Sequence, residues 1–311
     1  MTLRVATGTA VRILAPAKIN LVLAVLGPRG DGYHELRTIF QAVSLCDRVV
    51  LRPARSGVRV NCPALPDLGE NNLAHRAAAL FFEKTGVTGG VQIDLEKRIP
   101  SAGGLGGGSS DAAAVLLGCC RLFGQAPESG VLHEWAAALG SDVPFFLDGG
   151  AAIGSGRGEV LEPLAPFAGS VAALINLSPV GLSTAAVYRR LSSLHSANQT
   201  QQRLTESTRK LTIPLACWQG GDLRRLAKVL FNDLEPPAFA LAPELAVVKE
   251  ALSAAGAEAA LLCGSGSGVF GLFGSDSDAD RARRLLRGII PGRLIKVHFL
   301  PARRRWGVVK R

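Results

Sequence analysis

The twelve residues from Pro100 to Asp111 have the composition of a loop that binds a phosphate group. Their sequence is P-S-A-G-G-L-G-G-G-S-S-D, and five of the six positions from Gly103 to Gly108 are glycine. Glycine lets the backbone approach an anion closely, and the free N–H groups of a helix that starts just after the loop point at that anion. A flexible linker would need neither the apolar Leu105 nor an immediate helix start. The loop does not end in the Gly-Lys-Ser/Thr of a Walker A sequence.

A lysine and an amide lie two residues apart in an apolar segment near the start of the chain. Lys18 and Asn20 stand in A-P-A-K-I-N-L-V-L, which has the composition of a β-strand, so both side chains are expected on one face of a sheet. Burying them is costly unless a charged or polar group meets them. The alternative is an edge lysine whose ammonium group reaches solvent.

Asp142 lies between a glycine turn and the apolar run Val143-Pro-Phe-Phe. A carboxylate in this position is either the N-cap of a helix or a base that takes a proton in a shielded site. The local sequence leaves these two interpretations equal.

Tyr33 and His34 follow a glycine-rich turn and also have two interpretations. They are either a partly buried corner or a clamp for a flat heterocyclic base. An aromatic ring stacks on such a base, and histidine adds a polar edge.

The elements that position these residues follow from the hydrophobic pattern. In the first half, Ser109 or Ser110 is predicted as the N-cap of the helix after the glycine loop, with Asp111 in its first turn. We expect strands at 12–25, 38–45, 48–52 and 91–95, and helices at 72–85, 112–117 and 130–139.

The second half predicts an antiparallel sheet covered by helices, which makes the chain α+β. Strands are expected at 171–177 and 294–299 and on both sides of the turn Gly264–Gly268, whose N–H groups could line a pocket. Helices are expected at 184–191, 221–231, 243–255 and 277–287, with a polar loop at 192–212 and a turn at 232–237. A change in composition near 163–169 marks a boundary between a domain at 1–165 and one at 166–311.

Composition narrows the function classes. The 311 residues include no apolar run of ~18 residues, which argues against a membrane span, and the first ten residues lack the apolar core of a signal peptide. Six scattered cysteines without a C-x-x-C pair predict a reducing, cytoplasmic compartment and no structural zinc. The net charge of +10 favours anionic partners, and five basic residues lie at 303–311. Aromatic residues do not alternate with the basic ones, so phosphorylated small molecules explain the charge at least as well as nucleic acid.

Three stretches in this order resemble the motifs of the galactokinase–homoserine kinase–mevalonate kinase–phosphomevalonate kinase (GHMP) superfamily. They are Ala15–Leu21, Pro100–Ala113 and Leu262–Phe270. The resemblance implies a ribosomal-protein-like N-terminal ATP domain, a ferredoxin-like C-terminal domain and an active site between them. Ser101-Ala102 replaces the Met-Gly that the superfamily has more often, a change that should not disturb phosphate binding.

Within the superfamily, Asp31-Gly-Tyr-His-Glu and Gly140-Ser-Asp-Val-Pro-Phe-Phe resemble the branch that phosphorylates the C2 hydroxyl of a cytidine diphosphate-linked methylerythritol. By this resemblance Asp142 is the general base, and Lys18 orients the hydroxyl and promotes its deprotonation. Tyr33 and Tyr188 enclose the cytosine, and His34 contacts its edge. The resemblance also implies three groups of binding residues. The ATP phosphates are assigned to Pro100, Gly103, Gly104, Leu105, Gly106, Gly107, Gly108, Ser109 and Ser110, and the adenosine side to Asn72 and Lys97. The substrate pocket is assigned to Asn20, Tyr33, His34, Asp142, Thr184, Tyr188, Gly264, Ser265 and Gly266.

Phosphoryl transfer of this kind normally uses Mg²⁺ with ATP. The sequence assigns no Mg²⁺ ligands, although the Ser110 hydroxyl is one possibility. We expect a monomer or weak homodimer with no nucleic-acid or membrane partner. Two alternatives remain: another substrate of the superfamily, such as homoserine or a mevalonate, which would not need the Tyr33-His34 clamp, and RNA binding through the basic tail.

Overall fold

The computed structural model describes residues 10–194 and 215–302. The predicted polar loop lies outside the described residues from position 195, as do residues 1–9 and the basic tail at 303–311. No helix in the described part of the chain is long and apolar enough to cross a membrane.

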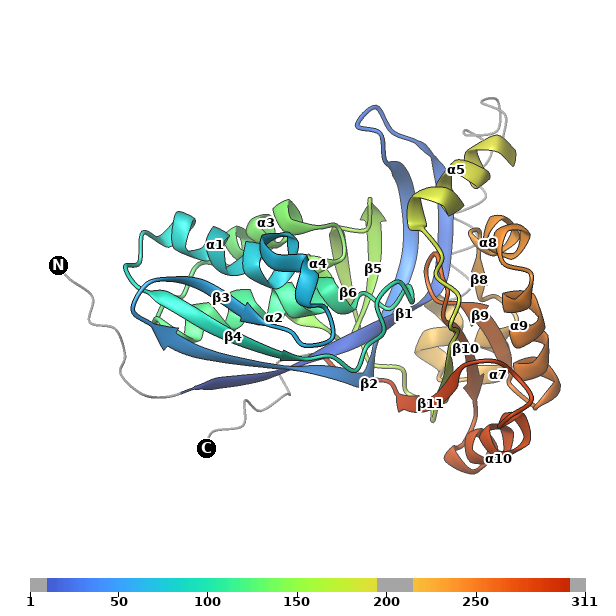
Figure 1. Ribbon diagram of the computed structural model, residues 1–311. Helices are drawn as coiled ribbons and strands as arrows, with labels where there is room; N and C mark the ends of the chain where they lie inside the picture. Colours follow the sequence, from blue (N-terminus) through green and yellow to red (C-terminus); the bar gives the residue numbers. More distant parts are fainter. Residues whose placement is uncertain (1–9, 195–214, 303–311) are drawn as a thin grey trace.

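The first half of the chain forms a layer of helices on a mixed sheet (Figure 1). The strands run in the order β3-β4-β2-β1-β8; β5 also pairs with β2, and β6 with β5. Long strands β1 and β2 pair antiparallel and form the centre. The strands are β1 (Val11–Pro28), β2 (His34–Ala54), β3 (Gly57–Asn61), β4 (Gly90–Glu96), β5 (Ala151–Gly156), β6 (Val160–Leu164) and β8 (Phe231–Asn232).

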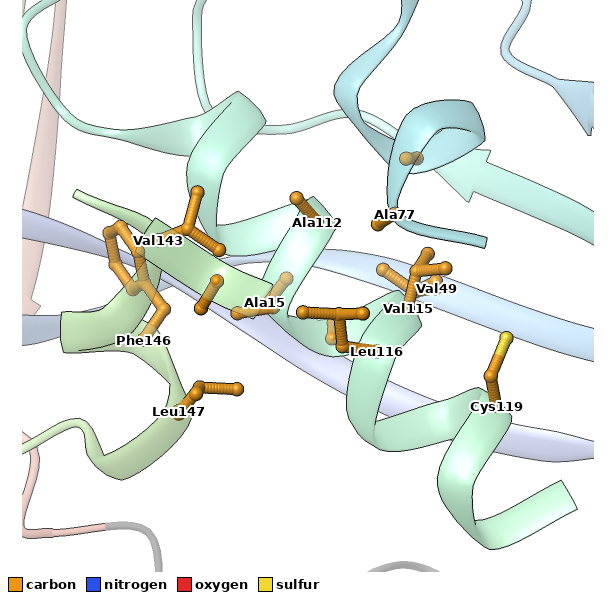
Figure 2. Packing of buried hydrophobic residues seen from close by; sticks show 14 of the residues in the cluster. Ala15, Val49, Ala77, Ala112, Val115, Leu116, Cys119, Val143, Phe146 and Leu147 are labelled. Carbon is orange, nitrogen blue, oxygen red and sulfur yellow. The ribbon is translucent and has the colours of Figure 1, made fainter. Parts of the chain in front are cut away.

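Helix α2 is the centre of the first core. Its mostly apolar side chains, including Ala112, Val115 and Cys119, pack between the sheet and the other helices (Figure 2). A Cβ at Gly118 would lie 2.5 Å from Leu51, so glycine there lets the helix approach β2 closely. The helical elements of this half are the 3₁₀ segment Pro66–Asn71 and α1 (Leu73–Thr85), α2 (Gly107–Leu122), α3 (Ser129–Leu139) and α4 (Val143–Asp148).

The second half forms an antiparallel four-stranded sheet in the order β11-β7-β10-β9, with helices packed against it. In chain order this is 4-1-3-2, as expected for a ferredoxin-like arrangement, and the predicted α+β class is confirmed. The elements are β7 (Ala172–Leu177), α5 (Thr184–Leu194), α7 (Leu223–Ala227), α8 (Glu235–Leu241), α9 (Glu244–Ala254), β9 (Ala259–Leu262), β10 (Val269–Phe273), α10 (Asp276–Leu286) and β11 (Arg293–His298).

Two predicted boundaries in this half are wrong. The helix expected at 221–231 is only Leu223–Ala227, and Phe231 instead begins β8, which pairs parallel with β1 at Val22 and Leu23. The turn expected at 232–237 ends early, because α8 begins at Glu235 with the prolines in its first turn, where a missing N–H costs nothing.

Candidate active site

The glycine loop joins β4 to the N-terminus of α2. Gly104 and Gly106 adopt left-handed conformations with φ of 71° and 70°. Leu105 is 1 % exposed, so its side chain anchors the loop in the core and leaves only backbone for a ligand. No side chain caps α2, so the N–H groups of its first turn remain available to an anion.

The predicted start of α2 is wrong. The helix begins at Gly107 with Gly106 as N-cap, so Ser109 and Ser110 lie inside the first turn and neither is the N-cap. Serine is favoured at N-caps because its side chain replaces a missing partner, but the left-handed Gly106 already turns the chain into the helix. Asp111 lies beyond the first turn.

The second glycine turn packs directly on the first. Ser267 donates its backbone N–H to the carbonyl of Ala102 (3.0 Å), and Gly268 donates to Gly103 (3.1 Å). A Cβ at Gly104 would lie 1.7 Å from the carbonyl oxygen of Cys263, so no other residue fits there. These contacts connect the glycine loop of the first half to the β9–β10 turn of the second.

Lys18 lies beside this junction on the central strand β1. Its ammonium group donates to Asn20 Oδ1 at 2.7 Å, which confirms that both side chains share a face. Lys18 is 5 % exposed, so the alternative of an edge lysine that reaches solvent is wrong. Register shifts on either side of Ala17–Asn20 change the pairing with β2, and such bulges direct side chains toward a site.

Asp142 occupies the N-cap position of α4, but its side chain makes no capping hydrogen bond. Its Oδ2 lies 3.6 Å from Lys18 Nζ instead. The carboxylate is about one-third exposed, whereas the ammonium group is buried. The side chain of Asp142 therefore does not cap α4 but forms an ion pair with Lys18.

A cavity of about 270 Å³ opens over this pair. It brings together most of the predicted substrate-side residues with two glycines of the predicted phosphate loop, and its lining comes from both halves of the chain. Thr184 and Ser265 share a hydrogen bond between their hydroxyls (2.8 Å) at its wall. The predicted residues that line it are Lys18, Asn20, Gly104, Gly106, Asp142, Thr184, Tyr188, Gly264 and Ser265.

The predicted base-binding residues lie at the outer end of this cavity and do not line it together. The ring of His34 packs against that of Tyr188, with centroids 4.9 Å apart, and burial lowers the pKa of His34. Tyr33 is 53 % exposed, and the guanidinium of Arg157 lies 4.8 Å from its ring centroid. Gly266 faces Leu262 and Leu182 rather than the cavity.

Sequence reasoning missed Arg157. It lines the cavity, and its guanidinium group lies over the exposed ring of Tyr33, yet no role was predicted for its G-S-G-R-G stretch. An arginine inside a glycine-rich turn was the available signal, since such turns often leave a side chain at a loop tip. Phe40 was missed too; its ring lies 5.4 Å from Lys18 Nζ and forms part of the wall.

A second cavity, of about 320 Å³, lies on the other side of the glycine loop. Asn72, Lys97, Pro100, Gly107 and Gly108 line it, so the predicted adenosine-side residues do meet part of the phosphate loop. Asn72 Oδ1 also accepts from the backbone N–H of Ala74 and so caps α1.

Lys97 is not a free cation in this cavity. Its ammonium group donates to Asp111 Oδ2 at 2.6 Å and to Asp47, which is fully buried. Asp47 also accepts from the backbone N–H groups of Arg98 and Ile99, which fixes the chain just before the glycine loop. Burial raises the pKa of Asp111 to about 7, and the nearby charge of Lys97 opposes that rise.

Comparisons with known proteins show the family of the chain. Models of the GHMP kinases N-terminal domain and the GHMP kinases C-terminal domain match residues 72–150 and 212–288. A 4-diphosphocytidyl-2-C-methyl-D-erythritol kinase of Moorella thermoacetica is 45% identical over 272 residues, which are 87% of this chain and 92% of that protein.

Solved structures extend the comparison. A crystal structure of 4-(cytidine 5'-diphospho)-2C-methyl-D-erythritol kinase is 38% identical, with a TM-score of 0.74, over 92% of this chain and 99% of that one. A homoserine kinase of Cytophaga hutchinsonii reaches a TM-score of 0.76 over 95% and 97% of the two chains. At 21% identity, the homoserine kinase shows only that the fold is shared.

Proposed function

This chain belongs to the 4-diphosphocytidyl-2-C-methyl-D-erythritol kinase family of the GHMP kinases, and from this premise we propose its reaction and the roles of its residues. The enzyme transfers the γ-phosphoryl group of ATP to the C2 hydroxyl of 4-diphosphocytidyl-2-C-methyl-D-erythritol. The products are the 2-phosphate and ADP, in the non-mevalonate route to isoprenoid precursors. The observation that carries the proposal is the buried Lys18 beside the partly open Asp142 at the glycine loop.

Asp142 takes the proton of the C2 hydroxyl as its oxygen attacks the γ-phosphorus. The bond from the γ-phosphorus to the β,γ-bridging oxygen breaks, and ADP leaves with that oxygen. Lys18 holds the reacting oxygen through its ammonium group, which Asn20 and Asp142 fix in place. Positioning and charge neutralisation are the main contributions that a protein makes to such a transfer.

The triphosphate of ATP lies against the first turn of α2, where Gly107, Gly108 and Ser109 present backbone N–H groups. The adenosine side occupies the cavity lined by Asn72 and Lys97. Since the Lys97 ammonium group is bound to two carboxylates, we assign it a role in shaping this wall, not in neutralising phosphate charge.

Mg²⁺ fits this site through the hydroxyl oxygen of Ser110, which has no hydrogen-bond partner among the described residues. This oxygen is buried at the start of α2. The described residues contain no group of three or more His, Cys, Asp or Glu side chains arranged to hold a metal. Mg²⁺ commonly binds through few protein oxygens together with nucleotide phosphates and water, so Ser110 would hold it there. The ion would neutralise charge on the phosphates.

The cytidine diphosphate end of the substrate lies toward Tyr33, His34 and Tyr188. Arg157, which lines the same cavity, supplies a cation near that end. Thr184 and Ser265 complete the polar wall. A substrate without a nucleobase, such as homoserine, would make no contact with these aromatic side chains.

We further propose that residues 1–165 carry the ATP side and residues 166–311 complete the substrate side. We expect the protein to act as a monomer or weak homodimer in the cytoplasm, without a nucleic-acid partner.

The proposal is tested by supplying candidate alcohols with Mg-ATP and following ADP release. 4-Diphosphocytidyl-2-C-methyl-D-erythritol should be turned over at least about a hundredfold more efficiently than homoserine or mevalonate, because those substrates leave polar groups in the base pocket unpaired. Product analysis by ³¹P NMR should place the new phosphate on C2. Equal or higher efficiency with homoserine or mevalonate would overturn the assignment.

A further inference from the structure

A third cavity lies at the C-terminal end of α10. Figure 1 shows α10 beside the second sheet, away from the β9–β10 turn that packs on the glycine loop. Its volume is about 510 Å³, within the range of small-molecule sites, and it shares no lining residue with the two cavities of the active site. Leu286 and Ile290 are buried side chains at its floor. The charged residues that line it are Asp280, Arg283, Arg284, Arg287 and Arg293.

The four arginines have no acidic partner in the described part of the chain, because the acids of α10 bind other groups. Asp276 binds His298 and Lys296, and Asp280 binds Lys296 at 2.8 Å. Asp278 binds Arg281 at 3.2 Å. Among the described residues that line the cavity, Asp280 is the one carboxylate, and it is paired with Lys296. None of the four guanidinium groups makes a hydrogen bond or ion pair with a described residue.

The helix dipole explains only part of this cluster. Arg283 and Arg284 lie in the last turn of α10, where positive charge is favourable. Arg287 lies just past the helix, and Arg293 begins β11. Between them the chain turns through Gly288 and Gly292, with φ of 78° and 88°, and returns Arg293 to the same cavity. Two separate elements thus place like charges around one space, which costs energy unless an anion occupies it.

We propose that this cavity binds a small polyphosphorylated anion at a site separate from the active site. The planar guanidinium group of arginine donates two parallel N–H hydrogen bonds to two oxygens of one phosphate group. A phosphate monoester carries a charge of about −2, so an anion with two or three phosphate groups balances the four cations. The apolar floor contributes no competing hydrogen-bond groups.

The test counts binding sites for inorganic tripolyphosphate on the full chain by equilibrium dialysis. The parent protein should bind two equivalents, one at the ATP site and one at the arginine cavity. Arg287→Gln and Arg293→Gln should each weaken the second site by about tenfold or more, because each removes charge-assisted hydrogen bonds. Arg281→Gln is the matched control: it removes the same charge from α10 but is outside the cavity lining, and it should change that affinity less than about twofold.

The variants should leave the ATP KM and the melting temperature unchanged, since all the altered side chains are exposed. A single equivalent bound by the parent would overturn the proposal. Equal weakening by Arg281→Gln would also overturn it, because the effect would then be general surface charge. Binding of an RNA hairpin without tripolyphosphate binding would assign the cluster to nucleic acid instead.

Discussion

Replacing Asp142 with asparagine tests the proposed base with little change in shape. The side chain makes no helix-capping hydrogen bond, so the amide should leave α4 in place. Loss of a general base typically lowers the rate about 10²- to 10⁴-fold, which is about 3 to 5 kcal/mol of barrier. We expect a fall in kcat of that size, with KM values for ATP and the alcohol changed less than about threefold, because the phosphate and base contacts remain.

The same substitution has a small predicted effect on stability. It removes an ion pair at 3.6 Å whose carboxylate is about one-third exposed, and the buried ammonium group keeps its bond to Asn20. Pairs with such exposure contribute roughly 1 kcal/mol or less. Asp148→Asn is the control: this carboxylate ends the same helix and binds His133 at 2.8 Å on the surface. It should leave kcat within about threefold of the parent, as expected for a surface substitution.

The assay is steady-state ADP release, followed by single turnover with enzyme in excess so that product release does not hide the chemical step. Urea unfolding of both variants separates loss of folding from loss of catalysis. The base assignment is wrong if Asp142→Asn turns over like Asp148→Asn. It is also wrong if the loss of rate follows an equally large loss of stability.

Three further outcomes follow from the site. Tyr33→Ala should raise the KM for the alcohol at least about tenfold and the ATP KM by less than twofold, since an aromatic stack on a base contributes about 1–3 kcal/mol; the opposite pattern in initial-rate measurements would discard the clamp. Burial lowers the pKa of His34 below 6.5, so its ring stays neutral on mild acidification. The KM for the alcohol should therefore stay constant down to pH 6.5 and rise only below it. His34→Gln should abolish that rise. In a urea titration, Asp47→Asn should lower the unfolding free energy by about 3–5 kcal/mol, because it leaves the buried Lys97 and two backbone amides poorly paired. The control Asp94→Asn removes a more exposed ion pair with Arg52 and should lower it by less than about 1 kcal/mol.

Local periodicity predicted the parts of the site that depend only on neighbouring residues. Lys18 and Asn20 share a face because the side-chain period of a strand is two, and no tertiary information is needed to see it. The phosphate loop could also be predicted from local sequence, because glycine spacing and an immediate helix start are local signals.

Tertiary contacts decided what local sequence left open. Asp142 had two equal interpretations from local sequence; in the structure it makes no capping hydrogen bond and lies 3.6 Å from Lys18, 124 positions away. Lys97 was predicted on the adenosine side, and local sequence gave no sign of its ion pair with Asp47, 50 positions away. The glycine-rich turn around Arg157 was only a weak signal, because the position of its guanidinium group over Tyr33 depends on the pairing of β5 with β2.

The start of α2 shows why propensity failed next to the ligand site. Serine has the higher preference for an N-cap, but the loop must also pass beneath the β9–β10 turn, where only glycine fits at position 104. This packing sets the path of the chain, and the left-handed Gly106 completes the turn into the helix. A close backbone approach of this kind cannot be seen in a single local sequence.

The same packing holds the glycine loop, beside Lys18 and Asp142, through backbone hydrogen bonds. Backbone hydrogen bonds from Ser267 and Gly268 hold the phosphate loop, and the Asn232 amide donates to the carbonyls of Leu262 and Gly264 on the opposing turn. Phosphoryl transfer needs this fixed geometry, because small misplacements are costly in rate. The side chain of Tyr33, by contrast, is half exposed: Asp31 and Arg29 hold its backbone, and the guanidinium group of Arg157 lies over its ring. We therefore expect substitutions at the outer end to alter which substrate binds, and substitutions beneath the phosphate loop to alter the rate for every substrate.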